Sequence, residues 1–297
     1  MATVLGVNQY GKAESRVVRI VRDTPVHEIR DLNVSTSLRG DFSGAHTTGD
    51  QSQVLPTDTQ KNTAFAYAKL HGITSPEDYA LALGRRLLEA TPAASAAQVR
   101  VEEYAWDRIG DHSFVRRGGA VRTAVVTVGR DESHVLSGVR DLVLLNSTDS
   151  EFKGFLEDEF TTLQEADDRI LATSLEARWR HATTDLDATD WNASYDAVLA
   201  RVLETFAGTY SRALQETLHA MGTAVLGDHP GIAEIRFSAP NKHHFLVDFT
   251  GFDVEGLTND GEVFVAADRP YGLIEAQVTR DDAPPAGDAW LHVPGFV

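Results

Sequence analysis

The segment SPEDYALALGRRLLEAT, residues 75–91, shows where the first half of the chain turns from strands to helices. Ser75 is a good helix N-cap, Pro76 stands at the first helical position, and the acidic residues 77 and 78 favour the positive end of a helix. Apolar side chains then recur on one face, at Tyr79, Ala82, Leu83, Leu87 and Ala90. The spacing predicts an amphipathic helix that packs on a core.

Strands and a second helix surround this helix. Residues 13–22 and 27–42 are rich in β-branched side chains, which predicts two strands joined by a turn near Pro25. The other elements expected here are a helix over 58–70 and strands over 97–108 and 120–130. The first half therefore has the order β-β-α-α-β-β.

The same order recurs in the second half, although no residue-level repeat is visible. We expect strands over 139–147 and 174–183, separated by an irregular insert at 150–172, and helices over 192–208 and 210–226. The later strands are expected around Ile235 and Phe237, from Phe245 to Phe249, and over 262–267 and 272–280, before an irregular tail from Asp281. Two such units imply antiparallel sheets with helices on one face, an α+β architecture.

Composition excludes several functions. The 297 residues are 42% hydrophobic and include no cysteine, which excludes disulfides, thiolate metal sites and a thiol nucleophile. The net charge of -17 disfavours a nucleic-acid partner. Because no apolar run approaches ~18 residues and no signal peptide is recognisable, we expect no membrane span and a cytoplasmic location.

Four polar segments differ from ordinary loops, at residues 8–12, 56–62, 152–169 and 240–245. Each also has a structural explanation. Thr57 or Asp58 can cap a helix, Lys12 can be a solvated strand-end charge, and His243 with its neighbour can be a loop pair or, less often, part of a metal site. Only five of the 27 basic residues are lysines, and those at 12, 61 and 242 lie inside these segments.

Taken together, these segments resemble the urate oxidase family over nearly the full chain and in the same order. The resemblance rests on Tyr10-Gly11-Lys12, Thr57-Asp58 with Lys61-Asn62, Ser150-Glu151-Phe152 through Arg169, Leu214-Gln215 and Pro240-Asn241-Lys242-His243. Residues 142–169 correspond to the specific family signature. The chain departs from the family at Asn146, often lysine, and at Leu214, often valine, where the backbone N–H is still available.

The resemblance implies a tandem tunnelling fold, with a first unit at residues 1–136 and a second at 137–297. Subunits of that family pair so that their sheets close a barrel, and they assemble into a homotetramer. The implied reaction converts urate, O2 and water to 5-hydroxyisourate and H2O2 in purine breakdown. It needs no metal, flavin or haem, so no cofactor is expected.

The resemblance also implies which residues bind the substrate, a planar purine anion. Phe152 would stack on the ring and Arg169 would grip one edge bidentately. Gln215 can both donate and accept at the opposite edge, while the helix N–H groups at Thr57 and Asp58 would hold the imidazole side. The implied binding residues are Thr57, Asp58, Phe152, Arg169, Leu214, Gln215 and Asn241.

The catalytic residues implied by the family are Lys12, Thr57 and His243. A threonine hydroxyl alone is too weak an acid to relay protons at neutral pH, whereas a nearby desolvated lysine can act as a base. Histidine can pass a proton in either direction, and Asn241 would hold O2 and later water above the urate plane. Because Lys12 and Thr57 belong to the first unit and the other groups to the second, the site is expected to be shared between two subunits.

Two other functions compete with this interpretation. A non-catalytic purine-binding protein on the same fold would need the binding residues but not Lys12, Thr57 and His243 as a set. A metal-dependent pterin or purine hydrolase of related fold would need a histidine cluster or cysteine at its metal. The intact relay speaks against the first, and the lack of cysteine against the second.

Overall fold

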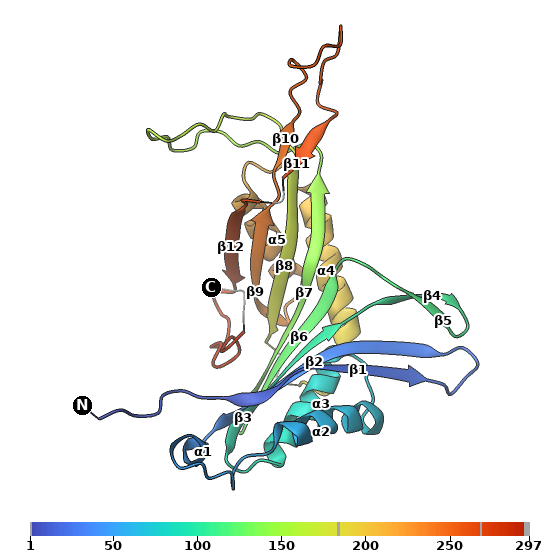
Figure 1. The fold of residues 1–297 in the computed structure, drawn as a ribbon, viewed down its shortest axis with the longest axis vertical. Coiled ribbons are helices and arrows are strands. Elements are labelled where there is room, and N and C mark those ends of the chain that lie inside the picture. Colours follow the sequence, from blue (N-terminus) through green and yellow to red (C-terminus); the bar gives the residue numbers. More distant parts are fainter. Residues whose placement is uncertain (1, 183–184, 268, 294–297) are drawn as a thin grey trace.

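An antiparallel sheet of eight strands is the frame of the protein in this computed structural model, which describes residues 2–182, 185–267 and 269–293 (Figure 1). In spatial order the strands are β1 (Tyr10–Val21), β2 (Glu28–Gly40), β3 (Ala94–Glu103), β6 (Val121–Gly129), β7 (Ser133–Asn146), β8 (Leu171–His181), β9 (Ile232–Asn241) and β12 (Gly272–Thr279). The first four belong to the first half of the chain and the last four to the second, so the sheet runs unbroken from one half to the other.

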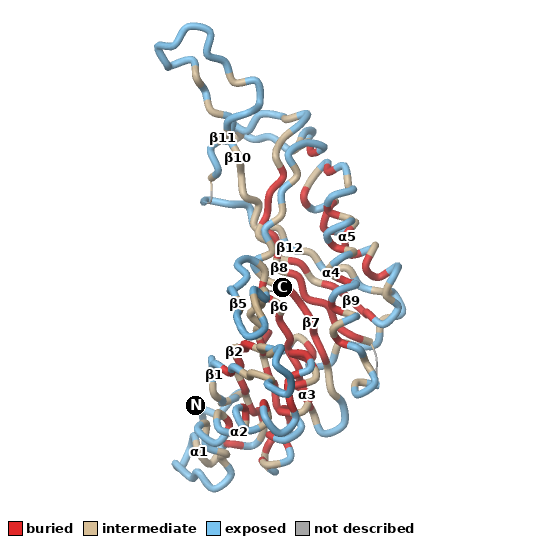
Figure 2. Tube along the Cα trace, turned by 90° about the vertical axis from the view of Figure 1, so that its right-hand side faces the viewer, coloured by how far each residue is buried: buried red, intermediate tan, exposed pale blue. Residues whose placement is uncertain are grey.

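Helices cover one face of this sheet. They are α2 (Thr57–Leu70) and α3 (Pro76–Glu89) in the first half, and α4 (Trp191–Gly208) and α5 (Leu214–Asp228) in the second. Figure 2 shows the buried residues gathered along the sheet and on the helix faces turned toward it. Leu83 of α3 belongs to one buried cluster with Val99 and Val126, and Leu218 of α5 belongs to another with Ile235, so each pair of helices has its own apolar core on the shared sheet.

The order of elements confirms the predicted α+β tunnelling fold. In chain order each half reads strand, strand, helix, helix, strand, strand within the main sheet. Ser75 caps α3 as expected, because its hydroxyl accepts a hydrogen bond from the Asp78 N–H. The division of the chain between residues 136 and 137 stays a prediction.

Three predicted elements differ from the structure. The strand expected over 97–108 is broken, because β3 ends at Glu103 and β4 (Trp106–Gly110) pairs with β5 (Ser113–Arg116) outside the main sheet. The helix expected from 210 begins at 214, because Ser211 bridges to Ser150 instead. The strand expected from Phe245 to Phe249 is the short β10 (His244–Leu246), which pairs with β11 (Phe264–Ala266). A short helix, α1 (Ser43–Thr47), was not predicted.

A buried polar cluster joins the two halves. Glu77 of α3 accepts hydrogen bonds from Arg122 of β6 (2.7 Å) and from the Ser137 hydroxyl of β7 (2.7 Å). The Ser137 oxygen lies 2.9 Å from His181 Nε2 of β8. Because the hydroxyl proton goes to the carboxylate, His181 must donate from Nε2. This cluster therefore couples α3 to the first two strands of the second half.

The tail beyond β12 has neither helix nor strand in its described part, as predicted. It packs on the helix-free face of the sheet. Trp290 donates from Nε1 to Glu234 (2.7 Å), and Gln98 of β3 donates to the Leu291 carbonyl (2.9 Å). Among the described residues, no helix is long and apolar enough to cross a membrane.

Candidate active site

The first group of predicted site residues lies where β1 and α2 begin. Lys12 is the third residue of β1 and is paired with Thr36 of β2. Thr57 is the first residue of α2 and follows Pro56. β1 and α2 are in contact, and the charge of Lys12 adds to the effect of Lys61 in lowering the pKa of Asp58.

Neither Thr57 nor Asp58 caps the helix, so that structural explanation is wrong. The N-cap is Pro56, and no side chain accepts a hydrogen bond there. The Asp58 carboxylate instead binds Lys61 (2.5 Å) and Asn62 (2.9 Å), and the hydrogen bond from Lys61 is the main cause that lowers its pKa. An uncapped helix N-terminus presents free N–H groups and a partial positive charge to an anion.

The second group is built on the connection between β7 and β8. Phe152 and Ala166 form an isolated antiparallel bridge, and the Arg169 N–H donates to the Ser150 carbonyl (2.7 Å). These backbone contacts fold the insert back on itself. They hold the Arg169 guanidinium over the Phe152 ring, 4.9 Å from its centre.

Arg169 has no ion pair among the described residues. It is half-buried, its Nε is buried without a hydrogen-bond partner, and burial lowers the pKa of its guanidinium. A cation that has lost part of its hydration and has no carboxylate beside it attracts an anionic ligand. With an aromatic ring beside it, Arg169 suits a planar anion.

His243 lies beside this guanidinium. It lies in the two-residue connection between β9 and β10, and its ring stacks on Phe245 with the two centres 5.8 Å apart. Burial lowers the pKa of His243, and the charges of Arg169 and His244 lower it further. The ring is therefore neutral at pH 7 and can accept a proton. Asn241 ends β9 and pairs with Thr173 of β8, in the strand that begins just after Arg169.

Leu214 and Gln215 begin α5 next to the same connection. Glu151 donates its N–H to the Ser211 carbonyl (2.8 Å), which brings the start of α5 close to the segment that carries Phe152. Leu214 is buried in the core while Gln215 is exposed. The helix has no side-chain N-cap, so no cap occupies the backbone N–H of Leu214. This agrees with the expectation that leucine, where the family often has valine, still offers its backbone N–H.

A single chain does not bring the two groups together. In Figure 1, α1 and α2 lie at one end of the long axis, whereas β10, β11 and the insert between β7 and β8 lie at the other. Figure 2 shows the same separation from a second direction. Lys12, Thr57 and Asp58 form one half of the predicted site, and Phe152, Arg169, Asn241 and His243, with Leu214 and Gln215, form the other.

One polar residue beside the first group was missed by sequence analysis. Gln60 of α2 is fully buried, on the same helix face as Ala64 and Ala68. The signal was available, because residues 60, 64 and 68 follow the four-residue spacing of a core-facing stripe. A polar side chain at the first position of such a stripe needs hydrogen-bond partners inside the protein.

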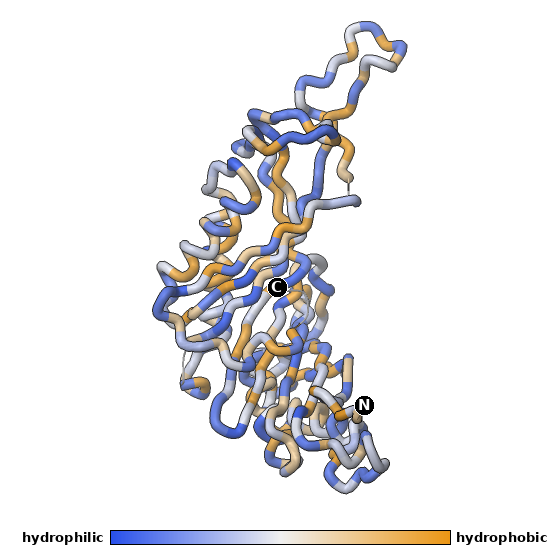
Figure 3. Tube along the Cα trace, turned by 90° about the vertical axis from the view of Figure 1, so that its left-hand side faces the viewer, coloured by the Kyte–Doolittle hydropathy of each residue, from blue (hydrophilic) through white to orange (hydrophobic). Residues whose placement is uncertain are grey.

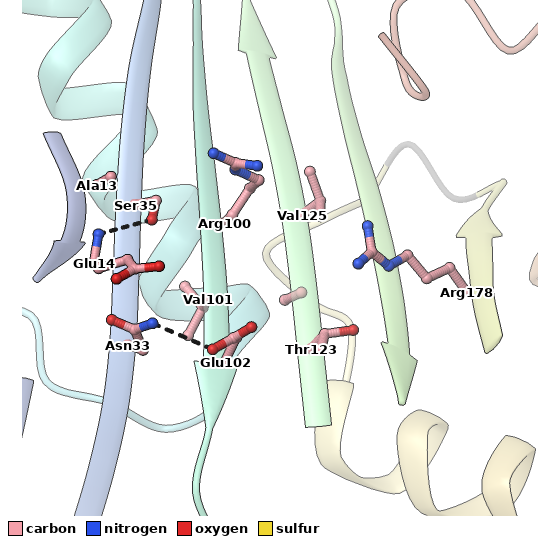
Figure 4. Close-up of a pocket in the computed structure, with 11 residues that line it drawn as sticks. Ala13, Glu14, Asn33, Ser35, Arg100, Val101, Glu102, Thr123, Val125 and Arg178 are labelled. Atoms are coloured by element: carbon pink, nitrogen blue, oxygen red, sulfur yellow. Dashed lines mark hydrogen bonds between the residues drawn. The ribbon is translucent and has the colours of Figure 1, made fainter. Parts of the chain in front are cut away.

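A cavity of about 180 Å³ lies elsewhere, on the helix-free face of the sheet (Figure 4). Arg100, Glu102 and Arg178 line it, and none of the predicted site residues does. Arg178 crosses β7 at Gly138, where an added Cβ would lie 2.7 Å from the Arg178 Cγ. Among the described residues no group of three or more metal-ligating side chains is found.

The exposed apolar side chains at the upper end of the molecule indicate an interface. Figure 3 shows hydrophobic residues interspersed along the loops that project there. Phe245, Leu246, Phe252 and Val265 are each about half exposed. The outer strands of the sheet, β1 and β12, also leave backbone groups without a strand partner. Both features favour association with further chains.

A sheet made of two β-β-α-α-β-β halves, with helices on one face and an anion-attracting guanidinium in its connections, defines a tunnelling-fold protein. Comparison with known sequences narrows this class. The sequence model of the family described as Uricase matches residues 8–127 and 135–275. The chain therefore belongs to the uricase family.

Individual relatives agree with this assignment. Uricase from Arthrobacter globiformis is 48% identical over 295 residues, which cover 99% of this chain and 95% of that protein. Uricase from Dictyostelium discoideum is 36% identical, with 94% and 98% covered. The crystal structure of the Arthrobacter globiformis uricase matches with a TM-score of 0.92 over 98% of this chain and 99% of that one. A uricase from Bacillus fastidious, 25% identical, matches with a TM-score of 0.78 over 92% and 93%.

Proposed function

We propose that this protein is a urate oxidase, which converts urate, O2 and water to 5-hydroxyisourate and H2O2 without a metal or organic cofactor. The observation that carries the proposal is Arg169, a half-buried guanidinium without an ion pair among the described residues, held against the Phe152 ring. Membership of the uricase family agrees with it. None of the relatives described above favours the alternative of a non-catalytic purine-binding protein.

The binding half of the proposal follows from the shape and charge of urate. The Phe152 ring covers one face of the flat purine, and Arg169 donates two parallel hydrogen bonds to one edge. Gln215 and the Leu214 N–H bind the opposite edge, and the first N–H groups of α2 bind the imidazole side. Because each contact lies in the plane or stacks on it, the site selects a planar anion.

The catalytic half assigns proton transfer to Lys12, Thr57 and His243. Lys12 removes a proton from urate through the Thr57 hydroxyl, and the resulting dianion is electron-rich enough to reduce O2. Two electrons pass from urate to O2, which takes up the proton held by Lys12 and a second proton from solvent and leaves as H2O2. Water supplies the oxygen of the new hydroxyl group at C5. His243, neutral at pH 7, accepts the proton of that water, and Asn241 holds first O2 and then water over the ring.

The proposal requires two subunits for each site, because α2 lies at one end of the long axis of the molecule and the insert between β7 and β8, which carries Arg169, at the other. We propose a homotetramer in which the sheets of two subunits close into a barrel by pairing β1 with the neighbour's β12. Each site then combines the first group of residues from one subunit with the second group from its neighbour. Two equivalent sites arise in each such pair.

The test is to add urate to the purified protein in air and follow urate absorbance together with H2O2. We expect one H2O2 for each urate consumed, and an unchanged rate after dialysis against a strong chelator. Urate that binds without being consumed would favour the purine-binding alternative. A rate that vanished on dialysis and returned only with copper or iron would overturn the cofactor-free mechanism.

The role of Lys12 has a matched control in Lys69, an exposed lysine at the end of α2. Lys12→Met removes the base, and a positioned general base contributes roughly 10²- to 10⁴-fold to a rate. We expect turnover to fall in that range while a non-oxidised urate analogue still binds. Lys69→Met should leave both properties unchanged.

A further inference from the structure

Gln60 connects three parts of the first half of the site. Its amide Oε1 accepts a hydrogen bond from the Thr36 hydroxyl of β2 (2.8 Å), and its Nε2 donates to the Leu55 carbonyl (3.4 Å) in the segment that leads into α2. The side chain is 0% exposed. Because Gln60 lies one turn after Thr57, these bonds fix the first turn of the helix to the sheet and to its own entry segment.

The same Thr36 also fixes Lys12. In the β1–β2 ladder the Cα partner of Lys12 is Thr36, and Gly11 stands opposite Ser37. The two strands approach so closely that a Cβ on Gly11 would lie 1.8 Å from the Thr36 carbonyl oxygen. Thr36 therefore pairs with Lys12 through its backbone and binds Gln60 of α2 through its hydroxyl group.

We propose that Gln60, acting through Thr36, is a positioning residue that sets the Thr57 hydroxyl at the right distance from Lys12 for proton transfer. The inference rests on the proposed function, because it assigns Lys12 and Thr57 to the relay. α2 has no side-chain N-cap that would hold its first turn in another way. The buried Gln60 amide therefore fixes the first turn of α2, as a side-chain cap does in other helices. It thereby fixes the position of Thr57.

The test begins with Gln60→Leu, which keeps the approximate shape and removes both hydrogen bonds. A displacement of about 1 Å can cost on the order of 100-fold in rate, so we expect kcat to fall at least ~10-fold. The affinity for a non-oxidised urate analogue should change less, because Arg169 and Phe152 belong to the other half of the site. Gln60→Glu, which can still accept from Thr36, should restore part of kcat.

The structure offers a matched control. Gln98 is also a buried glutamine that bonds a threonine hydroxyl, on Thr127, and a backbone carbonyl, on Leu291, but it lies on the opposite face of the sheet. Gln98→Leu should lower stability to a similar degree and leave kcat unchanged. If Gln98→Leu lowered kcat as much as Gln60→Leu, a general loss of packing would explain both, and the proposal would fail.

A double variant separates positioning from stability. Gln60→Leu alone leaves the buried Thr36 hydroxyl without its partner, whereas Thr36→Val with Gln60→Leu removes both polar groups and should recover much of the lost stability. We expect kcat of the double variant to stay low, because the link between β2 and α2 is still missing. Recovery of kcat together with stability would show that Gln60 is merely structural.

Hydrogen exchange of the amides at residues 61–63, which lie in the first hydrogen-bonded turn of α2, measured without urate, tests the inference independently of the reaction. Exchange should be faster in Gln60→Leu than in the wild type and unchanged in Gln98→Leu. Unchanged exchange in Gln60→Leu overturns the positioning role. A wild-type protein that fails to consume urate overturns the proposed function instead, and the two failures are thus distinguishable.

Discussion

Arg169 is the residue on which substrate affinity should depend most. A lysine in its place keeps the charge but loses the planar fork. Losing one charge-assisted hydrogen bond costs about 1.5–3 kcal/mol, so Arg169→Lys should weaken the apparent affinity for urate by roughly 10- to 100-fold. Arg212→Lys is the control, because Arg212 is exposed and paired with Glu216 near the start of α5. Unchanged affinity in Arg169→Lys would remove Arg169 from the site.

If His243 accepts a proton in the reaction, as proposed, it should determine how the rate responds to acid. Burial and the charges of Arg169 and His244 lower its pKa, so the ring stays neutral below the usual value of 6.5. The acid limb of kcat/KM, which reports the free enzyme, should therefore have its midpoint below pH 6.5. His244→Gln removes one of the lowering charges and should move the limb to higher pH, whereas the exposed His219→Gln should not. A limb that is unmoved in His243→Gln contradicts the assignment.

Single residues also show which features of the site could be predicted from the sequence and which could not. The residues of the site could be proposed from motifs, because residue type and order suffice for a resemblance, and their roles stay a prediction. The cap predicted at Thr57 or Asp58 was wrong, because Pro56 precedes the helix and Asp58 turns to Lys61. The spacing of residues 60, 64 and 68 could have shown that Gln60 is buried, but its partner Thr36, 24 residues away in the sequence, could not be predicted from a local pattern.

At the scale of elements, the joint between α3, β7 and β8 makes stability depend on pH. Burial, with the charge of Arg122, lowers the pKa of His181 to about 3, against 6.5 when the chain is unfolded. Between these values the unfolded chain binds a proton that the folded chain does not. The contribution of His181 to the free energy of unfolding is therefore fully present above pH 6.5. It decreases as the pH drops, by about 1.4 kcal/mol per pH unit.

Urea unfolding at fixed protein concentration, from pH 7 to pH 4.5, measures this slope. His181→Gln removes the titrating group and should flatten the dependence, although its stability at pH 7 falls. His219→Gln, an exposed histidine on α5, should keep the wild-type slope. If His181→Gln kept the same slope, other groups would account for the acid sensitivity.

Element order could be predicted better than element boundaries. The strands and helices of the main sheet follow from periodicity, since burial on one face fixes the spacing of apolar residues. The break after Glu103 could not be predicted in this way. Residues 106–110 have the composition of a strand, but their partner is β5 and not the neighbours of β3. Local propensity encodes strand formation, while pairing depends on contacts distant in sequence.

At the scale of the whole molecule, the shared site can be tested by complementation. Thr57→Ala and Arg169→Ala each damage one group, and each should be nearly inactive alone. When one Thr57→Ala chain pairs with one Arg169→Ala chain, one of the two sites contains both substitutions and the other contains neither. Random exchange makes about half of the pairs mixed, so about a quarter of all sites should be wild type by symmetry.

Recovery of activity toward that fraction would support two subunits per site. The two variants must first be shown to exchange subunits, for example by mass spectrometry of differently tagged chains. A mixture with confirmed exchange that stays as inactive as its parents would mean that each chain builds its pocket alone.

The distance between the two groups within one chain also has a genetic meaning. If each site is shared as proposed, a chain defective only at Arg169 leaves one of the two sites intact when it pairs with a wild-type chain, so an equal mixture should keep about half of its activity. A chain defective at both Thr57 and Arg169 leaves no intact site in any mixed pair, and an equal mixture keeps about a quarter. The double mutation should therefore be dominant-negative in co-expression, whereas either single mutation is simply additive.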